Sequence, residues 1–397
     1  MNAKQAKYPQ LRFKGFTDPW EQRKLGEEAQ LTMGQSPNSE NYTENPDDYI
    51  LVQGNADMKN GRVVPRVWTT QVTKKAEKSD LILSVRAPVG DIGKTDYDVV
   101  LGRGVAAIKG NEFIFQQLGK MKLTGYWTRY STGSTFESIN SNDIKDAKIM
   151  VPVEEEQQKI GSFFQQLDHL ITLHQRKLTK LKELKQGYLQ KLFPQNGSKF
   201  PQLRFAGFAD AWEERKLGEL ANIVRGASPR PIQDPKWFDK DSDIGWLRIS
   251  DVTEQDGRIR HLEQRISKLG QEKTRVLMEP HLLLSIAATV GKPLVNYVKT
   301  GVHDGFLIFL NPVFDREFMF QWLDMFRPKW KKYGQPGSQV NLNSELVRNQ
   351  EIDLPRIEEQ QQIGSFFKQL DDIIALHQRK LEKLQELKKG YLQKMFC

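Results

Sequence analysis

The sequence has almost no cysteine, few histidines and no long apolar run. Cys397 is the only cysteine among 397 residues, which excludes a disulfide within the chain and a cysteine-based zinc site. The six histidines show no metal-ligand spacing. Apolar stretches such as residues 276–290 carry charged residues and are too short to span a bilayer, and the first residues lack the apolar core of a signal peptide. We therefore expect a soluble, cytoplasmic protein.

Motifs for catalysis are also missing. An adenine methyltransferase would carry an N/D-P-P-Y/F motif, and the nearest tripeptides here (DPW, NPD, NPV) do not complete it. GDIGKT at 90–95 has Pro88 where a Walker A loop needs its first glycine, and GRGVAA at 102–107 has Ala107 where a dinucleotide fingerprint needs its third. No pattern marks a nuclease cluster of carboxylates and lysine, although these residues occur throughout. The sequence therefore favours a binding protein, with no catalytic residue and no metal site expected.

Basic residues outnumber acidic ones. The chain has 59 Lys and Arg against 50 Asp and Glu, a net charge of +9 at pH 7 and a pI near 9.3. A positive surface attracts polyanions over long distances. We therefore expect an anionic partner, with nucleic acid favoured over an anionic membrane surface and over an acidic protein.

Two segments of the chain occur twice. Residues 173–193 (LHQRKLTKLKELKQGYLQKLF) and 376–396 (LHQRKLEKLQELKKGYLQKMF) are identical at 17 of 21 positions. Residues 9–27 (PQLRFKGFTDPWEQRKLGE) and 201–219 (PQLRFAGFADAWEERKLGE) are identical at 15 of 19. The stretches between these segments cannot be aligned by eye, so the chain is not a solenoid with a short period. This order predicts one scaffold used twice, with a different insert in each half.

Each insert is expected to form mixed, mainly β structure. Short β-branched runs end at Gly, Pro or Asp turns, as strands in such domains do. An amphipathic helix follows, then a Gly/Ser loop, and a strand ending in proline leads to the repeated helix. The runs lie within residues 48–58, 61–73, 79–93 and 97–110 of the first insert, and within 244–253, 257–267, 281–291 and 305–313 of the second.

A heptad pattern predicts that the two repeated helices form a coiled coil. Apolar residues recur in a stripe wider than a two-stranded seam requires, so the matching stripes can bury each other and leave a surface for a different protein. About 38 residues would give a helix of roughly 57 Å, longer than a DNA turn of about 34 Å. A plain hairpin with solvated Lys and Arg faces is the alternative interpretation of the charges. The predicted a positions are Ile160, Leu167, His174, Leu181, Tyr188, Ile363, Leu370, His377, Leu384 and Tyr391.

The two histidines in this set, His174 and His377, are expected to be packing or register residues rather than metal ligands. The first copy adds apolar residues at the d and e positions, namely Phe163, Phe164, Leu170, Ile171, Leu178 and Leu184.

The repeated residues resemble one protein family. EEQQKIGSFFQQLDHLITLHQRKLTKLKELKQGYLQKLF (155–193) and its second copy are similar to the central and C-terminal conserved regions of the specificity subunit of type I restriction–modification enzymes. The PQLRF segments resemble the opening of each half in that family. The resemblance covers residues 1–397, and its doubled arrangement is specific, whereas the inserts match the family only in layout.

The resemblance implies an α+β fold of two pseudo-symmetric halves. Each half would be a mixed, β-rich target recognition domain followed by a long helix, and the two helices would pack as an antiparallel coiled coil. Each domain would read one part of a bipartite, asymmetric site in double-stranded DNA, and the helices would set the unread spacer. The helices would also dock two modification (methyltransferase) subunits, and restriction (helicase/nuclease) subunits would join this core.

The resemblance also implies that the chain is non-catalytic and binds no cofactor of its own. S-adenosylmethionine would belong to the modification subunits, and ATP with Mg²⁺ to the restriction subunits. The alternative is a coiled-coil scaffold without sequence-specific DNA binding, which explains the helices but not two unlike inserts.

The expected division of the chain has five parts. Residues 1–153 form the first target recognition domain, 154–193 the central helix, 194–200 a linker, 201–356 the second target recognition domain and 357–397 the C-terminal helix.

DNA contacts are expected from turn and loop residues of the inserts, because base edges are read by Arg, Lys, Asn and Gln while Ser, Thr and backbone amides hold phosphates. For any one of these residues the alternative is an ordinary surface turn, so the loops are predicted more firmly than their members. The candidates in the first insert are Arg62, Arg66, Arg86, Arg103, Arg129, Tyr130, Ser131, Thr132, Ser134 and Thr135. Those in the second are Arg225, Ser228, Arg230, Thr289, Lys292, Lys329, Lys331, Lys332, Tyr333, Gln335 and Gln339.

Overall fold

The computed structural model describes residues 7–130, 138–195, 197–333 and 342–397, with the side chains of 331–333 outside that description. The chain forms two compact units: unit 1 comprises Met1–Lys177 and His377–Cys397, and unit 2 comprises Leu178–Leu376. The two long helices are α4 (Glu154–Leu192) and α10 (Ile357–Met395), so each helix contributes to both units. The units therefore divide the chain inside these helices, whereas the predicted boundaries lie at their ends.

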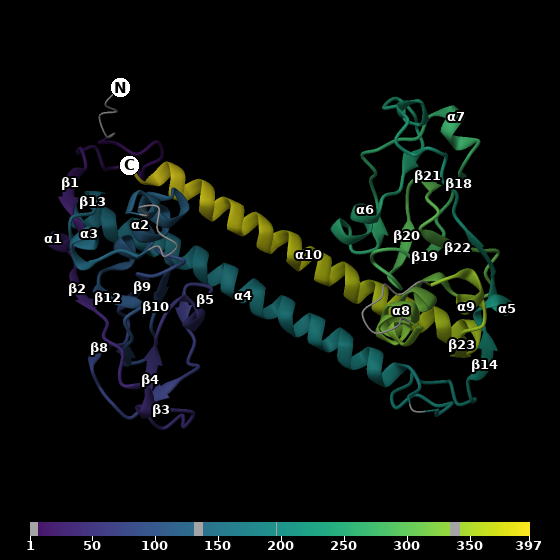
Figure 1. Ribbon diagram of the computed structural model, residues 1–397, viewed down its shortest axis with the longest axis horizontal. Coiled ribbons are helices and arrows are strands. Elements are labelled where there is room, and N and C mark those ends of the chain that lie inside the picture. The colour runs from purple at the N-terminus through teal and green to yellow at the C-terminus, as the bar shows by residue number, and fades with distance from the viewer. Residues whose placement is uncertain (1–6, 131–137, 196, 334–341) are drawn as a thin grey trace. The chain divides into compact units, whose positions relative to one another are not determined.

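Unit 1 contains a sheet of six strands in the order β2-β12-β9-β10-β6-β5, a sheet of five in the order β3-β7-β4-β11-β8, and the pair β1-β13 (Figure 1). Its strands are β1 (Glu21–Lys24), β2 (Gln30–Met33), β3 (Tyr42–Thr43), β4 (Tyr49–Val52), β5 (Met58–Lys59), β6 (Arg62–Val63), β7 (Trp68–Thr69), β8 (Lys74–Ala76), β9 (Leu81–Ser84), β10 (Ile92–Lys94), β11 (Val99–Leu101), β12 (Val105–Lys109) and β13 (Lys148–Val151). Its shorter helices are α1 (Leu25–Glu28), η1 (Ser39–Asn41), η2 (Asn55–Asp57), α2 (Glu112–Leu123), η3 (Tyr126–Tyr130) and α3 (Ser141–Lys145).

Unit 2 repeats the core of this topology, with sheets in the orders β15-β22-β19-β20-β17 and β16-β21-β18 and the pair β14-β23, and its sheets lack counterparts of β3, β5 and β7 among the described residues. Its strands are β14 (Glu213–Lys216), β15 (Asn222–Arg225), β16 (Gly245–Trp246), β17 (Arg258–Ile259), β18 (Arg275–Leu277), β19 (Leu282–Ser285), β20 (Pro293–Asn296), β21 (Thr300–Val302), β22 (Phe306–Leu310) and β23 (Glu351–Leu354). Its shorter helices are α5 (Leu217–Leu220), η4 (Pro235–Trp237), α6 (Ile249–Glu254), α7 (Lys268–Gln271), α8 (Arg316–Phe326), η5 (Arg327–Tyr333) and α9 (Ser344–Arg348).

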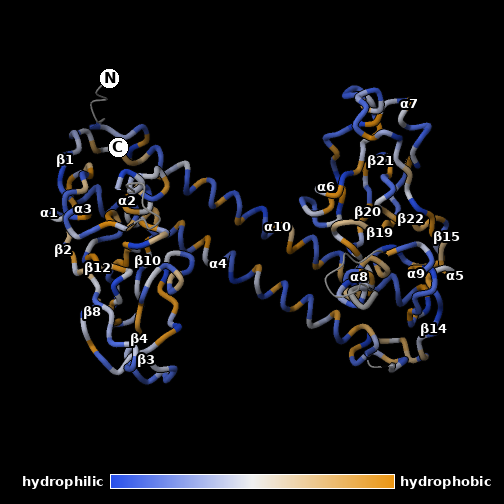
Figure 2. Tube along the Cα trace, viewed as in Figure 1, coloured by the Kyte–Doolittle hydropathy of each residue, from blue (hydrophilic) through white to orange (hydrophobic). Residues whose placement is uncertain are grey.

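The two inserts therefore share the strand order of a common core, followed by a helix, which confirms the predicted common layout. In both, the first sheet combines antiparallel neighbours with one parallel pair, β10 with β6 in unit 1 and β20 with β17 in unit 2. The central strands β9 (LILS) and β19 (LLLS) are buried at every residue, which is why they appear in the sequence as continuous apolar runs. Figure 2 shows the same distribution, with hydrophobic residues gathered in the sheets of each unit.

The helix after each sheet begins at a side-chain cap. The Asn111 side chain accepts a hydrogen bond from the Ile114 N–H at the start of α2, at 3.0 Å. The Asp315 side chain accepts one from the Phe318 N–H at the start of α8, at 2.8 Å. Such caps satisfy amide groups that the first helical turn leaves without partners.

In each unit, an aromatic cluster lies where the sheet domain meets the long helices. In unit 1, Trp20 of the repeated opening segment lies edge-on to Phe113 of α2, with ring centroids 5.6 Å apart, and Phe396 stacks on Phe113 at 5.1 Å. Phe164 of α4 contacts Phe396 as well. The opening segment, α2 and both long helices thus meet in one buried core.

Unit 2 has the same cluster made from the equivalent residues. Trp212 lies 5.8 Å from Phe318 of α8, and Phe193 lies 5.2 Å from Phe318. Phe367 of α10 completes it, 6.2 Å from Phe193. The sequence repeat is therefore a repeat of core packing.

Segments of α4 and α10 run antiparallel within each unit. In unit 1, Phe163 meets Tyr391, and further along α4 the Nδ1 atoms of His174 and His377 lie 3.0 Å apart. In unit 2, Tyr188 meets Phe366 with ring centroids 5.1 Å apart. The predicted a positions Ile160, Leu167, Ile363, Leu370 and His377 are buried, and His174, Leu181, Tyr188, Leu384 and Tyr391 are half-buried.

The histidine pair requires at least one neutral ring, because a hydrogen bond between two Nδ1 atoms needs one donor and one acceptor. Burial lowers the pKa of His377, and the charges of Lys177 and Lys380 act in the same direction.

Two features differ from the sequence-based expectation. The β1 and β14 strands lie in charged segments (EQRK and EERK) with no apolar alternation, and they form because each pairs with the strand before a long helix. The sequence predicts a strand within residues 244–253, but only Gly245–Trp246 form one. The chain then turns into α6 because the Asp251 carboxylate accepts a hydrogen bond from the Arg248 N–H at 2.8 Å.

A buried ion pair ties each opening segment to the start of a long helix. Arg12 donates two hydrogen bonds of 2.7 Å to Glu156, whose side chain is fully buried. Arg204 makes the same two-pronged contact with Glu359, also at 2.7 Å. A bidentate pair of this kind fixes both distance and orientation.

Removing one partner of this pair should be costly, because the other charge stays buried. We expect Arg204→Ala to lower the free energy of unfolding of unit 2 by about 3–5 kcal/mol. The matched control is Arg215→Ala, since Arg215 pairs with Glu219 at the exposed surface and its loss should have a much smaller effect. Urea unfolding of the two variants tests this, and equal losses would contradict it.

Candidate nucleic-acid interface

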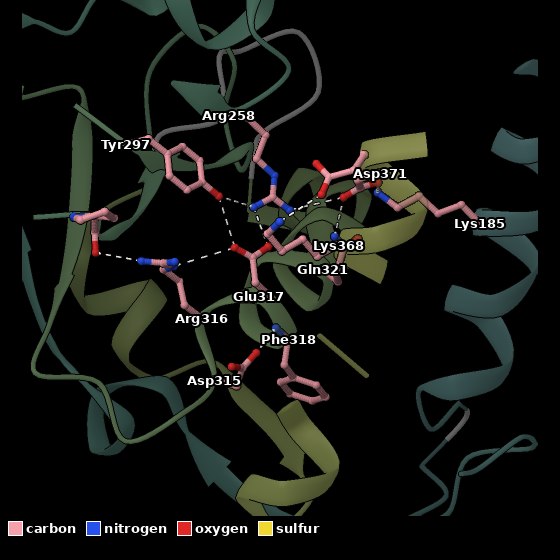
Figure 3. Close-up of polar contacts among 12 residues, drawn as sticks. Lys185, Arg258, Tyr297, Asp315, Arg316, Glu317, Phe318, Gln321, Lys368 and Asp371 are labelled. Atoms are coloured by element: carbon pink, nitrogen blue, oxygen red, sulfur yellow. Dashed lines mark hydrogen bonds and ion pairs between the residues drawn. The ribbon is translucent and has the colours of Figure 1, made fainter. Parts of the chain in front are cut away.

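A polar network joins the sheet domain of unit 2 to both long helices. Arg258 of β17 donates to Glu317 of α8 at 2.6 Å and to Asp371 of α10 at 3.3 Å (Figure 3). Gln321 of α8 donates to the same Asp371 oxygen at 2.7 Å, and Lys185 of α4 lies 2.7 Å from the other. Asp371 is therefore the point where α4, α8, α10 and the sheet meet.

The charges in this network stabilise each other. Burial acts to lower the pKa of Arg258, but the neighbouring Glu317 and Asp371 outweigh it and hold the pKa above its ordinary value. The Tyr297 hydroxyl accepts a hydrogen bond from Arg258 at 3.1 Å and donates one to Glu317 at 3.3 Å. The Arg258 guanidinium also lies over the Phe320 ring, 3.9 Å from its centroid. The arginine is thus held from several sides.

Unit 1 contains an equivalent network with a different cation. Gln116 of α2 donates to Asp168 of α4 at 2.9 Å and to Glu112 at 3.1 Å. Lys388 of α10 lies 2.6 Å from Asp168, and Lys94 of β10 lies 3.2 Å from Glu112. A glutamine-to-aspartate hydrogen bond, Gln116 to Asp168 and Gln321 to Asp371, therefore joins the helix after the sheet to a long helix in each unit. The glutamate is reached through Gln116 in unit 1 and through Arg258 in unit 2.

An open groove of about 1220 Å³ lies in unit 1 between the sheet domain and the helices. Leu170 and Leu173 of α4 line it and are 44% and 52% exposed. Their counterparts in unit 2, Ile373 and Leu376, are each 44% exposed. The basic residues that line the groove are Arg62, Lys94, Lys122, Arg176, Lys388 and Lys389. The helices thus carry exposed apolar residues at equivalent positions in both units, as the width of the heptad stripe predicts.

The candidate DNA-contacting residues of the first insert fall into three groups. Arg86 and Arg103 are exposed at turns, after β9 and between β11 and β12. Other side chains are held by neighbours. Arg62 pairs with Asp96, Arg66 donates to the Ala56 carbonyl, Arg129 lies over the Tyr126 ring, and Tyr130 packs against Trp127. Ser131, Thr132, Ser134 and Thr135 lie outside the described residues.

In the second insert the structure brings three candidates together. Arg225, Ser228 and Arg230 all contact Asp304, in the turn between β21 and β22. Thr289 donates to the Ser285 hydroxyl.

Lys292 pairs with Asp256 at 2.9 Å and its side chain is only 14% exposed, so a phosphate contact would require this pair to open. Lys329 lies over the Phe326 ring. Gln335 and Gln339 lie outside the described residues, as do the side chains of Lys331, Lys332 and Tyr333.

Sequence reasoning did not single out Asp304, Glu317 or Asp371. Sequence signals could have found two of them, Asp371 and Asp304. Asp371 and its counterpart Asp168 occupy the same place in the repeated helix, in FFKQLDD and FFQQLDH. Asp304 faces a Gly-x-Ser-Pro loop that occurs in both inserts, at 34–37 and 226–229.

Within the described ranges, no three His, Cys, Asp or Glu side chains gather as a possible metal site. In the same ranges, no helix combines the length and the apolar character needed to cross a membrane.

Comparisons with known proteins agree with the doubled architecture. At the level of solved structures, the S subunit of the type I restriction–modification system from M. genitalium superimposes with a TM-score of 0.69 at 15% identity, covering 98% of this chain and 99% of that one. A chain from a structure describing complex assembly and conformational transition of the type I R-M system gives a TM-score of 0.53 at 20% identity, covering 95% and 97%. At these identities the likeness concerns the fold.

Sequence relatives point to the same group. A protein of Methanocaldococcus jannaschii assigned as the type I restriction enzyme MjaX specificity subunit is 31% identical over 176 residues, 42% of this chain and 41% of that protein. The type I restriction enzyme MjaVIII specificity subunit of the same organism is 22% identical over 276 residues, 65% of this chain and 63% of that protein. The matched regions thus span less than two thirds of either relative.

The family model described as the type I restriction modification DNA specificity domain matches twice, at residues 17–183 and 209–386. Each match contains one sheet domain and most of the long helix that follows it. Together they cover well over half of the sequence, and the chain belongs to the type I restriction modification DNA specificity family.

Proposed function

We propose that this chain is the DNA-recognition subunit of a type I restriction–modification complex. Each half reads one part of a bipartite, asymmetric site in double-stranded DNA. The observation that carries this proposal is the contrast between the two units. They share the core strand order, the aromatic cluster and a glutamine–aspartate contact to a long helix, while the exposed loop residues differ, as two readers of different sequences require.

The same contrast assigns different roles to the repeated segments and to the loops. The repeated helices and opening segments hold the sheet domains, and the loops carry the residues that meet DNA. We propose that the chain itself performs no catalysis and works in the cytoplasm. Modification subunits would supply S-adenosylmethionine, and restriction subunits would use ATP with Mg²⁺.

We further propose that two modification subunits dock on the helices, one for each unit. The exposed apolar pairs Leu170–Leu173 and Ile373–Leu376 support this, because both copies keep an apolar residue at these positions although about half of each side chain is exposed to solvent in the chain alone. Exposed apolar residues with a polar rim are typical of protein interfaces. The basic residues that border the groove in unit 1 suit an acidic helical segment of the partner.

The docking proposal predicts a stoichiometry. Leu173→Asp and Leu376→Asp should each weaken one site by about 2–4 kcal/mol, since a charge in an interface core removes a central contact. At concentrations that saturate the wild type, each single variant should bind one modification subunit and the double variant almost none, as measured by sedimentation. Leu269→Asp is the control, because Leu269 is 45% exposed in α7, away from the helices. Unchanged assembly of the double variant would contradict the proposal.

Recognition itself is tested by mapping methylated adenines in the DNA of cells that express this chain with its modification subunit. We expect one split motif, two short specific sequences separated by a spacer of any sequence. An active modification subunit that produces no new motif would contradict the proposed function.

A further inference from the structure

In each unit, two loops of the sheet domain cross at close range. In unit 1 the loop after β2 crosses the β11–β12 turn. The Gln35 N–H donates to the Leu101 carbonyl at 2.9 Å, and the Arg103 N–H donates to the Ser36 hydroxyl at 3.1 Å. In unit 2 the loop after β15 crosses the β21–β22 turn. The Ala227 N–H donates to the Val302 carbonyl at 3.0 Å, and the Asp304 N–H donates to the Ser228 hydroxyl at 3.1 Å.

Glycine is required at the crossing in both units. A Cβ atom at Gly34 would overlap the Gly102 carbonyl oxygen, and one at Gly226 would overlap the His303 carbonyl oxygen. The backbones approach so closely that no side chain fits between them. The contact is therefore a fixed feature of the domain and not a chance surface arrangement.

A threonine from a third segment holds each crossing in place. The Thr73 hydroxyl donates to the Gln35 carbonyl at 2.5 Å in unit 1, and the Thr274 hydroxyl donates to the Ala227 carbonyl at 2.6 Å in unit 2. The next residue after the serine is a buried proline in both units. We call this set of contacts the loop crossing. It is the same in two inserts whose sequences otherwise cannot be aligned by eye.

The loop crossing presents a different charged group in each unit. In unit 1 the residue at the tip of the turn is Arg103, which is exposed. In unit 2 the same position is Asp304, and the exposed arginine comes from the other loop: Arg230 is 74% exposed and donates to Asp304 at 2.6 Å. An arginine therefore stands at the loop crossing in both units, supplied by a different loop in each.

Asp304 is itself fixed and charged. The Ser228 hydroxyl donates to one carboxylate oxygen at 2.8 Å, and Arg230 occupies the other. Partial burial acts to raise the pKa of Asp304, but the Ser228 hydrogen bond and the nearby positive charges outweigh it and hold the pKa below its usual value. The Arg225 Nε donates to the Asp304 carbonyl at 2.6 Å. The carboxylate is thus positioned to orient the Arg230 guanidinium.

We propose that the loop crossing is a base-reading position common to both domains, at which Arg103 contacts a guanine of the first half-site and Arg230 contacts a guanine of the second, with Asp304 as the residue that positions Arg230. This rests on the proposed function and deepens it, because it names the base and the residue. Bidentate donation from arginine to O6 and N7 of guanine is the commonest specific contact in the major groove. Fixing the side chain beforehand lowers the entropy lost on binding.

A phosphate contact is the competing role for an exposed arginine, and the two roles differ in what their loss does. Losing a phosphate contact weakens binding to all sequences alike, whereas losing a base contact relaxes preference at one position. The two units also provide controls for each other. Arg103→Ala should affect the first half-site alone, and Arg230→Ala the second alone.

The experiment measures methylation rates of the complex reconstituted from the full chain and its modification subunits, on duplexes in which each position of both half-sites is varied in turn. For Arg230→Ala we expect preference for guanine at one position of the second half-site to fall by roughly 10- to 100-fold, with the first half-site unchanged. Asp304→Asn should relax the same position by a smaller factor, because the arginine stays but loses its fixed partner. Thermal melting and binding of modification subunits show whether each variant is folded.

Two results would overturn the proposal: base preferences that stay as in the wild type in both arginine variants, or rates that fall equally for all duplexes. In either case a wild-type complex that still reads a split site leaves the proposed function standing. A wild-type complex without sequence preference would instead remove the proposed function, and the present proposal with it.

Discussion

In each unit a tryptophan from the repeated opening segment is buried against a phenylalanine of the helix that follows the sheet. Both rings pack on the phenylalanine that directly follows one long helix, and this residue contacts a phenylalanine of the other long helix. Aromatic side chains bury large areas and prefer such edge-on contacts. Next to each cluster, a buried arginine–glutamate pair holds the opening segment to the helix start. The opening segment, the helix after the sheet and both long helices meet at this junction. Because both copies of the repeat supply the same residues to it, the junction is built twice.

The residues outside the junction can differ between the two units. The sheets keep one strand order while their loops differ in length and charge, since strand order depends on apolar patterning and loops lie at the surface. The polar networks between sheet domain and helices are partly shared and partly different. Both units have an aspartate at the same place in the long helix, Asp168 or Asp371. The cation that pairs with the neighbouring glutamate is Lys94 in unit 1 and Arg258 in unit 2. Such a domain can change what its loops contact without losing its place on the helices.

The sequence predicted the repeated parts best. The heptad pattern identified the long helices, and the apolar runs located the central strands β9 and β19, because burial on both faces leaves an unbroken signal. The charged strands β1 and β14 gave no such signal, because their pairing depends on partners more than 100 residues away. For the interface, the sequence predicted arginine-bearing loops, and this stays a prediction. It could not show that Lys292 pairs with Asp256, or that Asp304 gathers three candidates, because both depend on how distant turns meet.

The central claim is that the repeated helices and opening segments carry assembly while the insert carries recognition, and exchanging one insert tests it most directly. Residues 28–146 would be replaced by residues 220–349, so that both units contain the second insert. The match of Glu112, Gln116 and Phe113 with Glu317, Gln321 and Phe318 should let α8 pack on the unit 1 helices. Mapping of methylated sites should then show the second half-site sequence twice and the first not at all. Persistence of the original two half-sites in this variant would contradict the account.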